Sequence, residues 1–548
     1  MKWKTVCLTA TLAAALNVNT LFGDPVERVI SADLRDTNGP LNTMFNFCVG
    51  AGRANEGLRA DWQRQLTCAH RECGVRYIRM HGLFDDDMGV YREDSHGNPE
   101  YNWQYIDQLY DFLESIGMKP FVELSFMPDQ LASGSKTIFW YRGNVTPPKD
   151  IKKWAELVRA FVLHEQQRYG NAEVRSWFFE VWNEPNLKNA FWTGTQQEYF
   201  DFYAATARAI KSVSPDYKVG GPATAGCRWV PEFIHFCDTN HAPVDFISTH
   251  TYGVESGYLD ATGTSGTALS LNPDSIWGDV KRVRREIAES AMPGLQLYFT
   301  EWSSSYTPAD PFHDSYLSAA YILDKLKNCD DAAQAMSYWT FTDIFEESGP
   351  RWEAFHGGFG LINYEDIKKP AFYAYQFLNR LGPIELKGSD QSSWICKDDR
   401  GDIQALGWDF SNIFPRTNMI NQVFYKRDLP SKAKYEVTLD LSHVHAGKYI
   451  METYQIGYRL NDAYDAYLDL GSPAQLTRAQ VAGIESNSSG APSEVSTIKI
   501  GHDGKFRRRF VLRENDVVML TLTPQYRVLQ RAPAAGAPKL ASTDQRGF

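Results

Sequence analysis

The chain has 548 residues, of which 43% are hydrophobic and 22% are charged, so its length and composition fit one large globular domain with a smaller one. Its 67 acidic residues outnumber its 56 basic residues, which gives a net charge of −11. This charge argues against nucleic acid and anionic membrane surfaces as partners, because both would repel an acidic protein.

The first 23 residues predict a signal peptide. Lys2 and Lys4 precede an apolar run over residues 6–16, and small and polar residues follow before Asp24. The run is too short to span a bilayer comfortably, and no later stretch is long and apolar enough for a membrane helix. We therefore expect a secreted or periplasmic protein without a membrane partner. The alternative is a buried N-terminal helix.

Residues 41–382 alternate between strand and helix patterns eight times. The predicted strands are short apolar runs without strict alternation, which is typical of parallel strands buried on both faces. They cover residues 44–49, 75–81, 119–126, 177–182, 218–222, 245–251, 296–301 and 335–341. Eight βα units in series predict an α/β protein with a (β/α)8 TIM barrel. An open doubly wound sheet is the alternative, but no phosphate-binding glycine motif follows the first strand.

The predicted helices lie between these strands. They cover residues 58–73, 103–116, 149–169, 196–213, 230–237, 276–290, 315–327 and 371–381. Thr195 and Glu198 have the spacing of a capping box before the fourth helix. Gly74 stands where the first helix needs a left-handed residue at its end.

After residue 382 the pattern changes to antiparallel β-structure. Tyr435, Val437, Leu439 and Leu441 alternate with polar residues, and residues 517–523 are rich in strand formers. Residues 398–401 predict a hairpin turn. We predict an accessory antiparallel β-sandwich over residues 383–526, joined by a strand from residues 24–40. Residues 527–548, rich in Ala, Pro and Gly, predict a flexible tail.

No cofactor or metal ion is expected. Outside the predicted signal peptide seven cysteines remain, with no Cys-x-x-Cys pair, and the sequence has no His-Glu-x-x-His motif and no phosphate loop. Seven sparse cysteines do not predict a disulfide scaffold, although one bridge stays open. They are Cys48, Cys68, Cys73, Cys227, Cys237, Cys329 and Cys396.

Two carboxylates stand at the ends of the fourth and seventh predicted strands. Glu184 follows Asn183 and precedes Pro185, which predicts extended backbone for Glu184, and Glu301 ends the seventh strand. Barrel enzymes place reacting groups at the C-terminal ends of their strands, so both would meet at one mouth. Cleavage of a glycosidic bond needs such a pair, because one group protonates the leaving oxygen while the other attacks or activates water.

Short sequence motifs surround these two carboxylates. Trp-Asn-Glu-Pro-Asn at 182–186 and Thr-Glu-Trp at 300–302 are similar to motifs of retaining barrel glycosidases that carry glutamates after strands four and seven. More specific segments follow in order along the barrel. They are Tyr-Ile-Arg-Met-His-Gly at 77–82, Gly-Asn-Val-Thr-Pro-Pro at 143–148, Glu-Trp-Ser-Ser-Ser-Tyr at 301–306 and Gly-Gly-Phe-Gly-Leu at 357–361. With these segments the sequence resembles glycoside hydrolase family 39.

The resemblance implies a role for each site residue. Glu184 would be the acid/base, Glu301 the nucleophile, and Asn183 a contact to the hydroxyl next to the anomeric carbon. Arg79 would support Glu301 electrostatically. The pocket for the non-reducing sugar would be lined by His81, His250, Tyr252, Trp339, Glu346 and Glu347. Adjacent acids repel each other, so we expect only one of the last two to bind hydroxyls directly.

The implied activity is that of an exo-acting retaining β-D-xylosidase that releases xylose from xylo-oligosaccharides during xylan degradation. The same chemistry on an α-L-arabinoside, an α-L-iduronide or an exopolysaccharide is the nearest alternative. A uronic acid would need a cation to meet its carboxylate, and the sequence does not place one. The alternative from another class is a non-catalytic carbohydrate-binding barrel, which would be expected to lack one of the two carboxylates. The oligomeric state, monomer or homo-oligomer, stays open.

Overall fold

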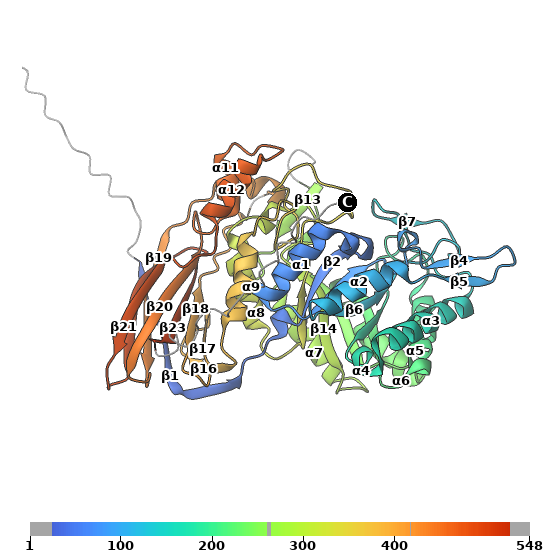
Figure 1. Cartoon of the computed structure of the whole chain (residues 1–548), viewed down its shortest axis with the longest axis horizontal. Coiled ribbons are helices and arrows are strands. Elements are labelled where there is room, and N and C mark those ends of the chain that lie inside the picture. The colour runs from blue at the N-terminus through green and yellow to red at the C-terminus, as the bar shows by residue number, and fades with distance from the viewer. Residues whose placement is uncertain (1–24, 260–264, 417, 526–548) are drawn as a thin grey trace, which may run out of the picture.

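The computed structural model describes residues 25–259, 265–416 and 418–525. The predicted signal peptide and the predicted tail both lie outside these ranges. A barrel domain and a β-sheet domain lie side by side (Figure 1). None of the helices in the described ranges combines the length and the hydrophobicity needed to cross a bilayer.

Eight parallel strands close into a barrel in the order β10-β11-β14-β15-β2-β3-β6-β9, which confirms the predicted fold class. All eight predicted strands overlap observed ones, and the carboxyl ends of the strands meet at one mouth. The strands are β2 (Cys48–Arg53), β3 (Tyr77–His81), β6 (Lys119–Leu124), β9 (Phe178–Val181), β10 (Lys218–Thr224), β11 (Phe246–Tyr252), β14 (Gln296–Ser303) and β15 (Ala335–Tyr338).

Helices connect the strands at the predicted places, and each buries an apolar stripe against the barrel. The capping box of Thr195 and Glu198 is present, and Gly74 ends the first helix at φ 71°. The main helices are α1 (Ala60–Cys73), α2 (Gln104–Ser115), α3 (Ile151–Tyr169), α5 (Gln196–Val213), α6 (Val230–Thr239), α7 (Trp277–Ala288), α8 (Leu317–Asn328) and α9 (Pro370–Arg380). Shorter ones are α4 (Asn171–Val174) and α10 (Asn421–Phe424).

Three small hairpins stand in the loops of the barrel and were not predicted. They are β4–β5 (Tyr91–Glu93 with Pro99–Tyr101), β7–β8 (Thr137–Ile138 with Gly143–Asn144) and β12–β13 (Val254–Leu259 with Ser265–Leu269).

The first barrel strand begins at Cys48, not at residue 44 as predicted. Residues Met44–Asn46 form a 3-10 helix, and the apolar signal at this point comes from its buried side chains. The strand continues through Gly50 and Gly52. Glycine has a low strand propensity, so this part of β2 has no strand signal in the sequence. Gly50 is required there, since a Cβ at this position would lie 2.2 Å from Cε3 of Trp339. The missing side chain lets the indole of Trp339 cross the strand.

The second domain is one nine-stranded sheet in the order β21-β20-β23-β18-β17-β16-β1-β19-β22. Its strands are β1 (Val26–Pro40), β16 (Ile384–Gly388), β17 (Ser393–Lys397), β18 (Ile403–Trp408), β19 (Ala433–Ser442), β20 (Gly447–Ile456), β21 (Glu494–Ile500), β22 (Phe506–Arg513) and β23 (Val517–Pro524). Residues 398–401 connect β17 and β18 as the predicted hairpin turn.

This sheet folds over on itself to give the two layers that the sequence predicted as a sandwich. Strands β18 and β19 stand four places apart in the sheet, roughly 19 Å if it were flat. Nevertheless Ala405 of β18 and Leu439 of β19 line the same small apolar space. β1 connects the layers because it pairs antiparallel with β16 and parallel with β19, with a register shift between Ala32 and Thr37.

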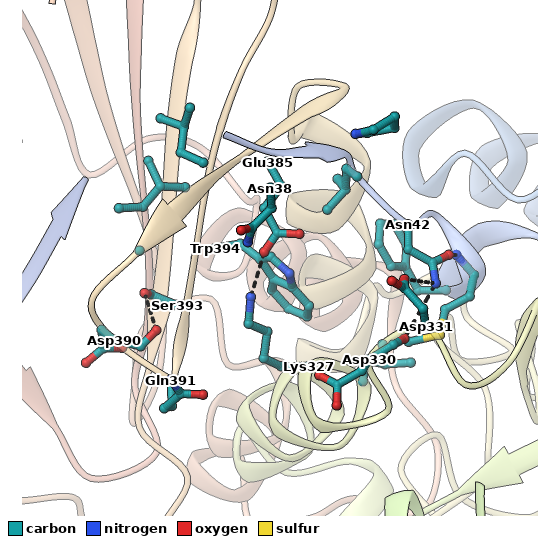
Figure 2. A pocket seen from close by; sticks show the side chains of 18 residues that line it. Asn38, Asn42, Lys327, Asp330, Asp331, Glu385, Asp390, Gln391, Ser393 and Trp394 are labelled. Carbon is teal, nitrogen blue, oxygen red and sulfur yellow. Dashed lines mark hydrogen bonds and ion pairs between the residues drawn. The ribbon is translucent and has the colours of Figure 1, made fainter. Parts of the chain in front are cut away.

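The sheet domain meets the barrel along α8. Lys327 of α8 donates to Glu385 of β16 at 2.8 Å and lies over the ring of Trp394 at 4.9 Å. These residues belong to a cleft of about 440 Å³ at the domain junction (Figure 2).

A helical insertion in the sheet domain supports the loop after the eighth barrel strand. It consists of α11 (Ala463–Asp469) and α12 (Arg478–Asn487), which lie between β20 and β21 and were not predicted. Tyr464 and Tyr467 of α11 pack against Phe355 of the loop. The insertion therefore braces a loop that also contains Glu346 and Glu347.

Candidate active site

One buried guanidinium group organises the inside of the barrel mouth. Arg79, at 0% exposure on β3, donates through Nε to Glu180 at 2.6 Å and through Nη1 to Glu301 at 2.6 Å. Its Nη2 lies 2.9 Å from Oδ1 of Asn183 and 2.8 Å from Oε2 of Glu123. A buried cation requires such partners, since burying it alone would cost several kcal/mol. Arg79 therefore ties the ends of β6, β9 and β14 to β3.

Glu301 is held at both oxygens. Arg79 donates to Oε1, and the hydroxyl of Tyr252 donates to Oε2 at 2.7 Å. Burial and the negative charge of Glu301 raise the pKa of Tyr252 well above its usual value, so the phenol keeps its proton at neutral pH. The sequence predicted Tyr252 as a wall of the sugar pocket, whereas the structure places its hydroxyl directly on Glu301.

Glu184 lies opposite Glu301 in a different electrostatic setting. One oxygen of each carboxyl lies within 4.8 Å of the other, which matches the spacing of retaining glycosidases (carboxyl groups about 5–5.5 Å apart) rather than that of inverting ones. Burial, followed by the charge of Glu301, raises the pKa of Glu184 well above its usual range. The environments therefore separate the two groups into an acid and a base.

The backbone at Glu184 is left-handed, with φ 44°, and not extended as Pro185 led us to expect. Its amide donates to the carbonyl of Ala223 on β10 at 2.8 Å, and this bond holds the conformation. Such a conformation costs a non-glycine residue about 1–3 kcal/mol. The surrounding barrel therefore imposes the direction in which the carboxyl group points.

A chain of hydrogen bonds leads from Glu184 into the barrel. Nδ1 of His250 lies 2.9 Å from Oε1 of Glu184, and Nε2 lies 3.1 Å from the hydroxyl of Thr300. Thr300 donates its only hydroxyl hydrogen to Glu180 at 2.7 Å, so its oxygen accepts the hydrogen on Nε2 of His250. Nδ1 of His250 then carries no hydrogen and accepts the proton of Glu184. Burial and two nearby cations lower the pKa of His250 well below its usual value, which keeps the ring neutral as this chain requires.

His250 therefore supports the acid, and both of its ring nitrogens have protein partners. The sequence predicted it in the wall of the sugar pocket. Glu184, His250 and Glu301 also have the residue types of a metal site. The guanidinium of Arg79, 2.6 Å from Glu301, would repel a divalent cation at that position, so the donor set fits acid–base chemistry better.

His81 is a charged member of the site. Its Nδ1 lies 2.8 Å from Glu123, and its Nε2 lies 3.6 Å from Oε1 of Glu347. Burial alone would lower the pKa of His81, but the charge of Glu123 and the hydrogen bonds to both carboxylates raise it to about 10. The ring is thus an imidazolium at neutral pH, placed between two acids.

Glu346 and Glu347 differ in the partners of their carboxyl groups. Both oxygens of Glu346 are occupied by guanidinium groups, Oε2 by Arg53 at 2.7 Å and Oε1 by Arg59 at 2.5 Å. These ion pairs anchor the loop of Glu346 to the end of β2 and the segment after it, and the contact of Glu346 with a sugar stays a prediction. Glu347 remains beside His81, which makes it the acid available to sugar hydroxyls.

Aromatic residues form the floor and rim of the mouth. The sequence predicted Trp339 as a platform under the sugar, and the structure buries it against His81 at 4.8 Å and Arg79 at 5.7 Å. Trp140, at 56% exposure, and Tyr306, at 42%, were not predicted. The amide of Trp140 donates to the carbonyl of Glu347, and Tyr306 packs edge-on against Tyr252.

The structure thus brings together Arg79, His81, Asn183, Glu184, His250, Tyr252, Glu301, Trp339 and Glu347. Thr300, Arg53 and Arg59 were missed as site residues. Thr300 had a readable signal, because it is a polar residue next to Glu301 that directly follows the apolar run of residues 297–299. The two arginines had none, since their partner lies nearly 300 positions away.

Comparison with known proteins agrees with this geometry. The pattern that describes glycosyl hydrolases family 39 matches residues 28–499, which include the barrel and most of the sheet domain. The chain belongs to glycosyl hydrolases family 39. A β-xylosidase from Geobacillus stearothermophilus is 38% identical over 485 residues, covering 87% of this chain and 92% of the relative.

Two crystal structures are similar to the family 39 chain over its length. A GH39 enzyme from Xanthomonas axonopodis pv. citri has a TM-score of 0.88 and 45% identity, covering 91% of this chain and 98% of the other. A monomeric β-xylosidase from Caulobacter crescentus CB15 has a TM-score of 0.88 and 43% identity, covering 91% of this chain and 100% of the other.

Replacement of Arg79 tests its place in this family 39 enzyme. We expect Arg79→Met to lower kcat/KM on an aryl glycoside substrate by at least ~100-fold and to lower the melting temperature, because three buried carboxylates lose their cation. The loss of one partner from a buried pair costs about 3–5 kcal/mol. Arg92→Met, at an exposed position, is the matched control and should change neither quantity. Near-normal kcat/KM in a folded Arg79→Met would contradict the assignment.

Proposed function

We propose that the chain is a retaining exo-β-D-xylosidase that releases xylose from the non-reducing end of xylo-oligosaccharides. The observation that carries the proposal is the buried pair of Glu184 and Glu301, with oxygens within 4.8 Å and with unequal electrostatic environments. The substrate follows from the β-xylosidases among its relatives in family 39. The presence of both carboxylates argues against the non-catalytic alternative.

In the first step, a carboxylate oxygen of Glu301 attacks the anomeric carbon while Glu184 transfers its proton to the leaving glycosidic oxygen. The bond between the anomeric carbon and this oxygen breaks, and an ester between the sugar and Glu301 forms. Arg79 and Tyr252 orient Glu301 for the attack. Oδ1 of Asn183 already accepts from Arg79, which leaves its NH2 group for the hydroxyl next to the anomeric carbon.

In the second step, Glu184 acts as a base. The ester removes the negative charge of Glu301, and with it the repulsion that raised the pKa of Glu184. The carboxylate of Glu184 can therefore persist until a water molecule arrives. It takes a proton from that water while the water oxygen attacks the anomeric carbon. The bond between this carbon and Glu301 breaks, which restores the carboxylate of Glu301 and releases xylose with net retention.

The pH profile tests the acid. Because the folded-state pKa of Glu184 is raised, the protonated form persists above the ordinary range of a glutamate. We expect kcat/KM for a β-xyloside with a poor leaving group to fall on the alkaline side as Glu184 ionises. Glu184→Ala should remove this limb, lower turnover by about 10²–10⁴-fold and respond to azide by forming the β-xylosyl azide. An unchanged alkaline limb in Glu184→Ala would assign the acid to another residue.

The exposed rings at the mouth support an oligosaccharide substrate. Trp140 and Tyr306 are exposed; the amide of Trp140 donates to Glu347, and Tyr306 packs on Tyr252. Tyr252 in turn donates to Glu301. Aromatic faces pack well on the C–H surfaces of sugars. We assign these two rings to the binding of further xylose units at the mouth of the barrel.

One observation favours a uronide as the second candidate substrate. Nε and Nη2 of Arg351, four residues after Glu347, are buried without a hydrogen-bond partner among the described residues. Burial lowers the pKa of Arg351, and the charges of Asp343 and Glu347 oppose this effect. An α-L-iduronide would bring a carboxylate that this guanidinium could bind.

A panel of aryl glycosides separates these substrates. We expect the β-D-xyloside to be turned over faster than the α-L-arabinoside, the α-L-iduronide and the β-D-glucoside, and Glu301→Ala to lower xyloside turnover by roughly 10⁴-fold or more. No turnover of either pentoside would rule out the xylosidase, and preference for the iduronide would favour the second candidate. Substantial activity in Glu301→Ala would remove it as the nucleophile.

We further propose that the enzyme acts outside the cytoplasm, in the breakdown of xylan. The charged and then apolar composition of residues 1–23 supports export. Its substrates would be the short xylo-oligosaccharides that other enzymes release.

A further inference from the structure

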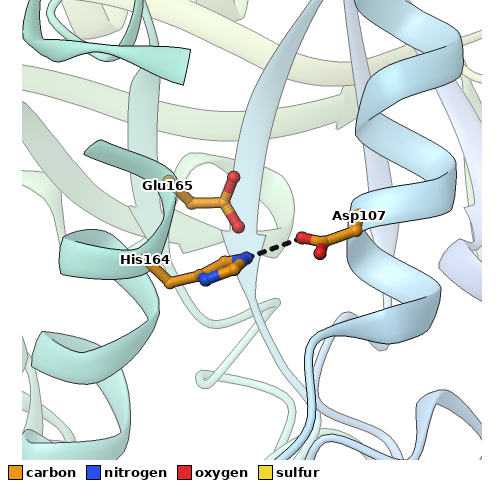
Figure 3. Close-up of side chains that lie close together, drawn as sticks. All are labelled: Asp107, His164 and Glu165. Carbon is orange, nitrogen blue, oxygen red and sulfur yellow. Dashed lines mark hydrogen bonds and ion pairs between the residues drawn. The ribbon is translucent and has the colours of Figure 1, made fainter. Parts of the chain in front are cut away.

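Three side chains between α2 and α3 form a cluster that the reaction does not use. Asp107 belongs to α2, and His164 and Glu165 belong to α3 (Figure 3). One oxygen of each acid and one ring nitrogen of His164 all lie within 4.8 Å of one another. Nε2 of His164 lies 2.6 Å from Oδ1 of Asp107. The cluster stands on the outer helices, whereas Glu184 and Glu301 stand at the strand ends inside the barrel.

Glu165 is the unusual member. It is 0% exposed, and neither carboxyl oxygen has a hydrogen-bond partner among the described residues. Figure 3 shows its carboxyl group directed towards Asp107 and the ring of His164. The ionised form lacks a donor and the protonated form lacks an acceptor, so either state would be costly to bury alone. An ion bound at these oxygens would remove the cost.

The local charge balance favours a cation. Arg168 lies 3.2 Å from Asp107 and donates to Asp111. Its single positive charge is therefore shared by two carboxylates, and Glu165 is a third acid beside them. When Glu165 ionises to bind an ion and His164 is neutral, Asp107, Asp111 and Glu165 place three negative charges against the one positive charge of Arg168. A divalent ion bound there would balance the difference.

We propose that Asp107, His164 and Glu165 bind Zn²⁺ through Nε2 of the imidazole and one oxygen of each carboxylate, with water as the fourth ligand. Imidazole combined with carboxylate is a donor set that zinc accepts, with tetrahedral bonds of about 2.0–2.2 Å. The ring of His164 is held in place by stacking on Trp103 at 5.4 Å and 20°. To accept the ion, Nε2 of His164 and Oδ1 of Asp107 need to separate by less than about 1 Å from their hydrogen-bond distance, and the oxygen of Glu165, within 4.8 Å of both, needs to move closer. Such a site would link α2 to α3 and stabilise the barrel without touching the catalytic carboxylates.

Calorimetric titration of the full-length enzyme, stripped with EDTA, with ZnCl2 tests this site. We expect one Zn²⁺ per chain and a higher melting temperature with the ion present. Glu165→Gln and His164→Gln should each weaken binding at least tenfold (about the lower bound for loss of a metal-site contact) and remove the thermal shift. His96→Gln is the matched control, because His96 lies on the surface near a single acid, Asp94. Xyloside turnover should be the same in all of these variants.

Absence of binding by the wild type at roughly 100 μM Zn²⁺ would overturn the proposal. Equal binding by the wild type and both ligand variants would also overturn it, because the ion would then sit elsewhere. If Glu165→Gln does not fold, Asp107→Asn at the partly exposed side of the cluster decides the matter. Retained zinc affinity in Asp107→Asn would contradict the site, and a loss of at least tenfold would support it.

Discussion

The ion pairs of Arg79 are the interaction on which the rest of the site depends. This one guanidinium contacts Glu123 of β6, Glu180 of β9 and Glu301 of β14, as well as Asn183 beyond the end of β9. Three carboxylates inside a barrel would repel each other and could not all be buried without a cation among them. The contacts of Arg79 offset the repulsion among these buried carboxylates and also set the position of Glu301. Stability and reactivity are therefore coupled at Arg79.

The asymmetry between the two catalytic carboxyls follows from this arrangement. Glu301 has Arg79 and Tyr252 as donors, whereas Glu184 has the neutral ring of His250 and the nearby charge of Glu301. The orientation of His250 in turn depends on Thr300, whose hydrogen is directed to Glu180 and thus back to Arg79. Two identical residue types therefore take opposite roles because of their neighbours. When the ester forms on Glu301, the same coupling allows Glu184 to change from acid to base.

Most of the barrel could be predicted from the sequence, because its strands are short apolar runs and its helices carry end signals. The predicted start of β2 was wrong, because Gly50 and Gly52 weaken the strand signal; Gly50 leaves room for the indole of Trp339 and Gly52 for the carboxyl group of Glu56. Glu184, Glu301 and Arg79 could be named because strand ends in a barrel converge. The different partners of Glu346 and Glu347 could not be predicted, because they depend on Arg53 at the end of β2 and on Arg59, almost 300 residues earlier. The helices α11 and α12 were missed because the prediction extended the strand patterns at residues 435–441 and 517–523 to all of residues 383–526.

The central claim is that Glu301 forms a covalent bond with the sugar while Glu184 supplies the proton. Mass spectrometry of the enzyme after reaction with 2,4-dinitrophenyl 2-deoxy-2-fluoro-β-D-xyloside tests it most directly, because the fluorine slows release of the sugar from the nucleophile. The account predicts one fluoroxylosyl group per chain, on the peptide that contains Glu301, and no such group in Glu301→Ala. A label on another carboxylate, or loss of the dinitrophenyl group without any label in the wild type, would contradict it.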